Sequence, residues 1–157
     1  MTPDRFETHR PMLLAGLRRW YGFAEAPDQI PLDWQRFVAR LPLAGQIGDV
    51  TYGATCDADT ANGRFEYMSA VEVATFDGLR PDVGRMRVPE ATYAVFVHQG
   101  PVSGIRQTIM GAHGWLASNG EWKDGGTPNF ERYGAYYDPV TGTSDITLWL
   151  PVVSVAG

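Results

Sequence analysis

The sequence predicts an α+β fold in which two β-α-β-β halves form one curved, mostly antiparallel sheet, with two helices on one face and a ligand cleft on the other. Three observations predict this fold: short β-forming segments between turn residues, two segments with helical spacing of apolar side chains, and weak similarity between the two halves. The length of 157 residues suits one domain. We therefore expect a single domain over residues 1–157, with an internal repeat at about 10–75 and 90–153.

The composition narrows the class of protein. A net charge of −5 without a cluster of Lys and Arg argues against direct binding of nucleic acid. No apolar run is long enough to cross a membrane and no secretion signal opens the chain, so we expect a cytoplasmic protein. The one cysteine, Cys56, allows no intrachain disulfide, and its spacing from the histidines predicts no metal site. We also expect no cofactor, because no glycine-rich phosphate loop is present.

The first half of the chain contains a segment of uncertain type followed by a helix. Apolar side chains in residues 12–21 fit a helical stripe, but the repeat described below favours a strand there, and we predict a strand. The helix is expected to begin near Asp28 as its cap, with Pro31 in its first turn, and to end before Pro42. Its apolar face consists of Ile30, Trp34, Phe37, Val38 and Leu41.

A hairpin and a linker complete this half. Residues 50–56 and 64–73 are predicted strands, joined by a polar turn over 57–63. The segment 76–90 is rich in glycine and proline and is predicted to be a linker.

The second half has the same expected order. An apolar β-forming run predicts a central strand, and helical spacing with interior glycines predicts the second helix. The predicted elements are, in order, a strand at 92–98, a helix at 102–118, a loop at 121–127, a strand at 130–137, a turn at 138–142 and a strand near 145–152.

A shift of 81 residues aligns parts of the two halves. Tyr52-Gly53-Ala54 then falls on Tyr133-Gly134-Ala135, and one predicted hairpin falls on the other. In this alignment Glu131 replaces Val50. A carboxylate that the shared scaffold does not require points to a function at that position.

Glu131 lies in the most aromatic run of the chain, residues 128–137. Alternation along a strand places Glu131 and Tyr133 on one face. A carboxylate among aromatic rings suits an organic cation with flat apolar parts, because the charges attract and the rings cover the apolar parts. The simpler interpretation, a half-exposed strand with a solvated glutamate, remains open on the local sequence.

Several short motifs together carry a family resemblance over nearly the whole chain. They are Trp34-Gln35-Arg36-Phe37, Phe65-Glu66-Tyr67-Met68, Tyr93-Ala94-Val95-Phe96 before Gly100-Pro101, Trp115, Phe130-Glu131-Arg132-Tyr133 and Leu150-Pro151-Val152. On a doubled β-α-β-β frame, this set resembles the GyrI-like effector-binding domains. These occur as ligand-binding halves of AraC- and MerR-type multidrug-responsive regulators, as DNA gyrase inhibitory proteins and as free-standing modules. More narrowly, the chain is similar to stand-alone cationic drug-binding modules of integron gene cassettes.

The resemblance implies a binding module for lipophilic cations. In that family the glutamate that matches Glu131 faces the cation from the floor of an aromatic cleft. We expect Glu131 on the face of the sheet away from the helices. The side chains expected to line the cleft are Tyr67, Trp115 and Tyr133, with Trp34 and Phe37 deeper or at the rim.

Two alternative functions remain open. Some relatives are hydrolases that use the cleft glutamate with an aromatic partner, which would make Glu131 a base or a water-positioning group. No nucleophile–base–orienter set can be identified, so we assign no catalytic residue and favour binding without turnover. The other alternative is a protein-binding inhibitor of a partner such as DNA gyrase. A homodimer and association with a separate regulator are both compatible with the sequence, whereas direct transcriptional control is not expected, since no helix-turn-helix segment is predicted.

Overall fold

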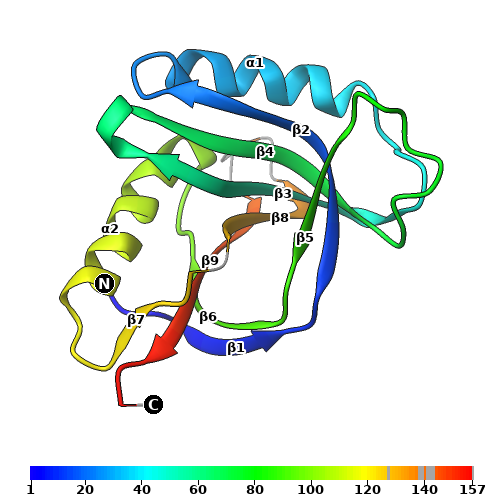
Figure 1. Ribbon diagram of the computed structural model, residues 1–157. Coiled ribbons are helices and arrows are strands. Elements are labelled where there is room, and N and C mark those ends of the chain that lie inside the picture. Colours follow the sequence, from blue (N-terminus) through cyan, green and yellow to red (C-terminus); the bar gives the residue numbers. More distant parts are fainter. Residues whose placement is uncertain (127, 138–139, 141–143, 157) are drawn as a thin grey trace. The chain divides into compact units, whose positions relative to one another are not determined.

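The structure is a computed structural model that describes residues 1–126, 128–137, 140 and 144–156 (Figure 1). These residues form two helices and nine strands, which confirms the predicted α+β class. The chain divides into two compact units, which we describe separately. Unit 1 comprises Met1–Pro11 and Pro89–Gly157, and unit 2 comprises Met12–Val88. Unit 1 is thus built from two stretches of chain that are far apart in the sequence.

Unit 2 has the predicted strand–helix–strand–strand order. Its elements are β2 (Met12–Gly22), α1 (Ala26–Val38), β3 (Gln46–Asp59), the short 3-10 turn η1 (Thr60–Asn62), β4 (Arg64–Val73) and β5 (Gly84–Val88). The strands are antiparallel in the spatial order β3-β4-β2-β5. Helix α1 packs on one face of this sheet.

The strand at Met12–Gly22 confirms the prediction made there against the local helical spacing. This strand pairs with β4 on one side and β5 on the other, and Leu14 and Ala15, which point to opposite faces, are both fully buried. A central strand is buried on both faces, so its apolar residues need not alternate. Gly16 is required here, because a Cβ at this position would collide with the carbonyl oxygen of Ser69 on β4.

Helix α1 differs from the prediction at both ends. It begins at Ala26 and ends at Val38, so Asp28 lies in the first turn and is not the cap. The cap residue is Glu25, whose side chain instead accepts a hydrogen bond from the backbone N–H of Gly22 at 3.0 Å. The acidic side chain of Asp28 still suits the positive end of the helix dipole.

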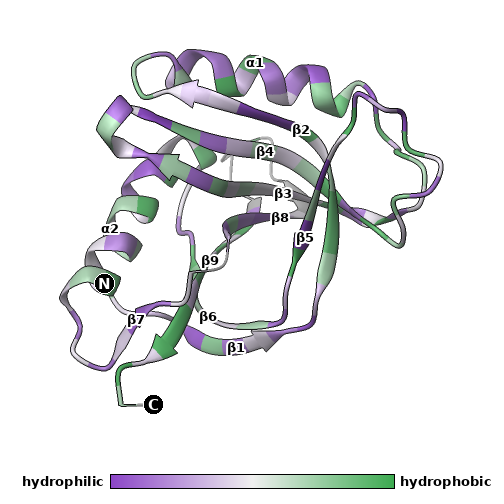
Figure 2. Cartoon of the chain, in the orientation of Figure 1, coloured by the Kyte–Doolittle hydropathy of each residue, from purple (hydrophilic) through white to green (hydrophobic). Residues whose placement is uncertain are grey.

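Three short strands were not predicted. They are β1 (Arg5–His9), β5 inside the expected linker, and β7 (Trp122–Asp124) inside the expected loop. Hydrophilic residues interrupt β1 and β5 in Figure 2, and only Met86 and Val88 of β5 are buried. Strands this short carry too few alternating residues to be recognised, and pairing with a longer neighbour stabilises them.

Unit 1 repeats the strand–helix–strand–strand order and adds β1 at its edge. Its elements after β1 are β6 (Ala91–Val97), the 3-10 turn η2 (Val102–Gly104), α2 (Ile105–Ser118), β7, β8 (Asn129–Tyr137) and β9 (Ser144–Ser154). The antiparallel order is β1-β6-β9-β8, and β7 pairs with the end of β9. Apart from Val140, the turn expected at 138–142 lies outside the described residues.

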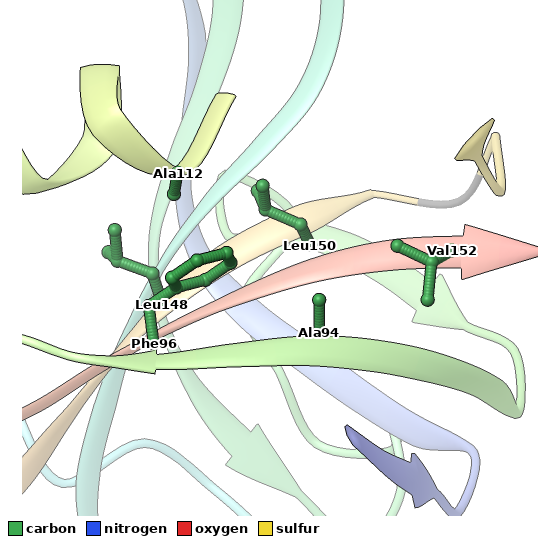
Figure 3. Packing of buried hydrophobic residues seen from close by; sticks show 6 residues of the cluster. All are labelled: Ala94, Phe96, Ala112, Leu148, Leu150 and Val152. Atoms are coloured by element: carbon green, nitrogen blue, oxygen red, sulfur yellow. The ribbon is translucent and has the colours of Figure 1, made fainter. Parts of the chain in front are cut away.

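The core of unit 1 lies between α2 and the β6–β9 strand pair. Ala112 of α2 points at the side chains that β6 and β9 direct to this face (Figure 3). The buried members of this α2-side cluster are Ala94, Phe96, Ala112, Leu148, Leu150 and Val152. The small side chain of Ala112, together with Gly111 beside it, lets the helix approach the sheet closely.

The strand ladders place the repeat at a different offset from the predicted 81 residues. Ala15 faces Val71 in unit 2, and Ala94 faces Leu150 in unit 1, so both strands are offset by 79 residues. All four side chains belong to the cluster beneath the helix of their own unit. The matched Tyr-Gly-Ala triplets are therefore not structurally equivalent.

Candidate functional site

Glu131 and Tyr133 form a hydrogen-bonded pair on β8. Glu131 is 9% exposed, and the Tyr133 hydroxyl donates a hydrogen bond to its Oε1 at 3.0 Å. The two residues are two positions apart on one strand, so their side chains share a face, as strand alternation predicts. The simpler interpretation of Glu131 as a solvated surface carboxylate is therefore wrong.

The environment of this pair keeps the phenol protonated. Burial raises the pKa of Tyr133 well above its ordinary value, and the neighbouring Glu131 carboxylate and the hydrogen bond to it raise this pKa further. Tyr133 is therefore a hydrogen-bond donor at neutral pH and cannot act as a base. The hydrogen bond orients the carboxylate but leaves its negative charge in place.

The face on which Glu131 lies differs from the expectation. Glu131 is opposite Leu148 on β9, and directly paired residues of an antiparallel ladder share a face. Leu148 packs in the α2-side cluster with Ala112 (Figure 3). Glu131 therefore lies on the face that α2 packs against, not on the opposite one, and a ligand that contacts it would lie on the α2 side of these strands.

Aromatic packing fills the opposite face of the same strands. Phe130 stacks on Trp149 with ring centroids 5.5 Å apart, and Tyr93 meets both rings at steep angles. All three side chains are 3% exposed or less. The aromatic residues that flank Glu131 in the sequence therefore serve two different faces.

Trp115 shares the face of Glu131 but packs with other residues. It lies on α2, half-buried, and its ring contacts those of Phe96 at 5.6 Å and Phe6 at 6.1 Å. Within the described ranges, no hydrogen bond or ring contact joins Trp115 to Glu131. Its assignment to the ligand site remains a prediction.

The other three predicted lining residues belong to unit 2, where they form one aromatic group. The indole N–H of Trp34 donates to the Tyr67 hydroxyl at 3.1 Å, and the rings of Trp34 and Phe37 meet edge to face at 5.9 Å. Phe37 and Tyr67 are 3% and 5% exposed, while Trp34 is half-buried. Tyr67 points to the α1 side of the sheet, because it shares a cluster with Trp34 and with Ala26 at the start of α1.

A buried carboxylate that was not predicted holds α1 in place. Asp33 is 1% exposed and accepts a hydrogen bond of 2.6 Å from the Tyr21 hydroxyl. Arg19 and Arg36 reach its two oxygens at 3.1 and 3.0 Å. Burial and the hydrogen bond to Asp33 raise the pKa of Tyr21 above its ordinary value. A carboxylate beside Trp34 on an otherwise apolar helix face is the sequence signal that could have revealed this network.

Other reactive groups have structural roles. Burial raises the pKa of the Cys56 thiol to about 11, so the thiol is protonated at neutral pH. The His98 ring bridges the Thr108 hydroxyl at 2.7 Å and the Pro101 carbonyl at 2.8 Å, linking the end of β6 to α2. Among the described residues, no group of three or more metal-binding side chains is present, and no helix is long and apolar enough to cross a membrane.

Comparison with known proteins identifies the family. Residues 3–153 match the model of the GyrI-like small molecule binding domain. The chain belongs to this GyrI-like family. The predicted family resemblance is thereby confirmed, and the protein is a GyrI-like small-molecule binding domain.

One curated relative is a larger regulator. The transcriptional regulator BrlR of Pseudomonas aeruginosa is 29% identical over 134 residues, which are 83% of this chain and 49% of that protein. This GyrI-like chain therefore spans about half the length of that relative.

Solved structures share the fold. The SAV2435 protein bound to tetraphenylphosphonium has a TM-score of 0.75 at 20% identity, over 95% of this chain and 93% of that chain. The integron cassette protein VCH_CASS2 from the mobile metagenome of Vibrio cholerae has a TM-score of 0.70 at 15% identity, over 95% of each chain. The EcmrR C-terminal domain has a TM-score of 0.69 at 15% identity, over 96% of this chain and 97% of that chain. At these identities, the likeness establishes the fold alone.

Proposed function

We propose that this GyrI-like domain binds lipophilic organic cations and that Glu131 is the charge partner of the cation. The observation that carries the proposal is a carboxylate only 9% exposed, held by the Tyr133 phenol at 3.0 Å on an apolar face. Ionised carboxylates are costly to bury, and a cation within a few ångströms offsets that cost. An apolar cation loses little hydration on entering such an environment, so it suits this site better than a small hydrated ion.

Aromatic side chains supply the remaining contacts in this proposal. Tyr133 and Trp115 of unit 1, and Tyr67, Trp34 and Phe37 of unit 2, are assigned to the ligand's apolar surface. Aromatic faces attract cations, and such contacts contribute about 0.5–2 kcal/mol each. The SAV2435 protein, which shares the fold, is bound to tetraphenylphosphonium, and this supports a lipophilic cation as the ligand class.

The regulator relatives suggest how binding could be used. BrlR is a transcriptional regulator, and EcmrR has been solved in complex with DNA, with this chain covering 57% of that protein. We therefore propose a cytoplasmic multidrug-binding module that passes ligand occupancy to a second copy of itself or to a separate regulator.

A pair of probes of like shape and opposite charge tests the proposal. Tetraphenylphosphonium and tetraphenylborate are titrated into the parent protein and into Glu131→Gln, with tryptophan fluorescence and calorimetry as readouts. The parent should prefer the cation, and Glu131→Gln should bind it about ten- to a hundredfold more weakly, because a charge-assisted contact contributes about 1.5–3 kcal/mol. Equal affinity of the parent for both probes, or unchanged cation affinity in Glu131→Gln, would refute the assignment.

The hydrogen-bonded Glu131–Tyr133 pair also keeps a hydrolase as the second candidate. In this role Glu131 would activate water and Tyr133 would hold the carboxylate in position. Mass spectrometry of ligands incubated with the protein separates the two functions, since a product that requires Glu131 shows turnover. A captured protein partner whose binding ignores such cations would instead favour an inhibitor of a protein such as DNA gyrase.

A further inference from the structure

A buried hydroxyl in unit 2 has no hydrogen-bond partner. Ser69 lies in the middle of β4 and is 1% exposed, and its Oγ has no partner in the part of the chain that the structure describes. Nearly all buried polar groups in proteins are paired, and an unpaired one lowers stability. A hydroxyl in this state calls for an explanation outside the folded chain itself.

Ser69 faces the aromatic group assigned to the ligand. Alternation along β4 puts its side chain on the same face as Tyr67 and Val71, the face on which α1 packs. Trp34 of α1 packs against the cluster of Tyr67 and also against the cluster of Val71. The hydroxyl is therefore placed between two residues that both lie in contact range of the Trp34 side of α1.

The neighbouring strands leave room beside this hydroxyl. Ser69 is opposite Leu17 on β2 and opposite Gly53 on β3. Because Gly53 has no side chain, the β3 side of the hydroxyl is not covered from within this ladder. A ligand atom or a water molecule is the kind of partner that this gap can hold.

The repeat gives the position further meaning. At the offset of the ladders, Leu17 and Ser69 correspond to Phe96 and Leu148 of unit 1. The third member of each row is Gly53 in unit 2 and Glu131 in unit 1. Each unit therefore carries one polar side chain in the same row of an otherwise apolar, helix-covered face.

We propose that the Ser69 hydroxyl is a hydrogen-bonding contact for the ligand. The chain would then select lipophilic cations that carry a hydroxyl, ether or amine group over cations built of hydrocarbon alone. This inference rests on the proposed cation-binding function and adds the chemistry of a second ligand group to it.

A matched series of phosphonium cations tests the inference. The series is tetraphenylphosphonium and the ortho, meta and para isomers of (hydroxyphenyl)triphenylphosphonium, titrated into the parent, into Ser69→Ala and into Ser118→Ala. Ser118 is the control, because its exposed hydroxyl already donates to the Gly114 carbonyl at 2.8 Å. The parent and Ser118→Ala should bind at least one isomer about tenfold more tightly than tetraphenylphosphonium, and Ser69→Ala should lose this preference.

Thermal stability provides the second readout. Ser69→Ala should melt at the parent's temperature or above it, because it removes an unpaired buried hydroxyl. A melting temperature several degrees lower would show that the folded chain already satisfies the hydroxyl, for example through a buried water, and would overturn the inference. Tetraphenylphosphonium binding through Glu131 without preference for any isomer in the parent would overturn it while leaving the proposed function intact. Binding of none of the four cations would remove both.

Discussion

The hydrogen bond between Tyr133 and Glu131 can be tested apart from any ligand. Tyr133→Phe removes the hydroxyl and leaves the ring. The bond is 3.0 Å long and its acceptor is 9% exposed, so the variant leaves a buried carboxylate without its phenol donor. Hydrogen bonds to charged groups contribute about 1.5–3 kcal/mol, and we expect the free energy of unfolding to fall by this amount at pH 7.

A double-mutant cycle then isolates the charge. In Glu131→Gln the amide oxygen can still accept the phenol hydrogen, but that bond joins two neutral groups and contributes about 0.5–1.5 kcal/mol. Tyr133→Phe should therefore cost about 1 kcal/mol less in the Glu131→Gln background than in the parent. Glu131→Gln alone should be as stable as the parent or more so, because it removes a buried charge.

Urea unfolding of the four proteins at pH 7 gives the required energies, provided that the slopes with denaturant agree. An equal cost of Tyr133→Phe in both backgrounds would show that the phenol does not interact with the carboxylate's charge. No cost in either background would show that the hydrogen bond itself is absent in solution.

Two further predictions concern pH and packing. The pKa values of Tyr133 and Tyr21 are raised in the folded chain, so their contribution to stability is complete below about pH 10 and is lost as the pH rises further. Replacing either by Phe should reduce the alkaline fall in the free energy of unfolding by about 1.4 kcal/mol per pH unit, measured by urea unfolding between pH 9 and 11. Gly16→Ala should lose at least about 2 kcal/mol, because the new methyl group would collide with the Ser69 carbonyl oxygen. Gly114→Ala, which meets nothing within 4 Å in α2, should instead gain up to about 1 kcal/mol; similar thermal shifts in both variants would contradict this packing.

Sequence periodicity was sufficient where one strand or one helix decides the outcome. The bounds of β4 match the prediction at both ends, and the period of two correctly placed Glu131 and Tyr133 on one face. The strand at Met12–Gly22 required the comparison of the two halves, because its apolar spacing also fits a helix. In each of these cases the relevant interactions lie within a few residues of chain, or repeat in the second half.

Long-range pairing decides what the sequence could not predict. Matching identical residues aligned Tyr52-Gly53-Ala54 with Tyr133-Gly134-Ala135, whereas the ladders align Gly53 with Glu131. A change of register by one residue moves a side chain to the other face of a sheet, so the face of Glu131 could not be read from local patterns. The Asp33 network was missed for a related reason, since Tyr21 and Arg19 meet it from another element.

The division of unit 1 into two stretches has a consequence for how the protein is made. Strand β1 pairs with β6 across most of the chain, as the hydrogen bond between the hydroxyls of Thr8 and Thr92 shows, with 84 positions between them. A ribosome therefore delivers β1 first and its partner only after the whole of unit 2 has emerged. Unit 2 is continuous and has its native partners early, whereas β1 must wait with its pairing groups exposed. Synthesis thus favours completion of unit 2 before unit 1, and the waiting β1 strand is the segment that most needs protection from wrong pairing while the chain is made.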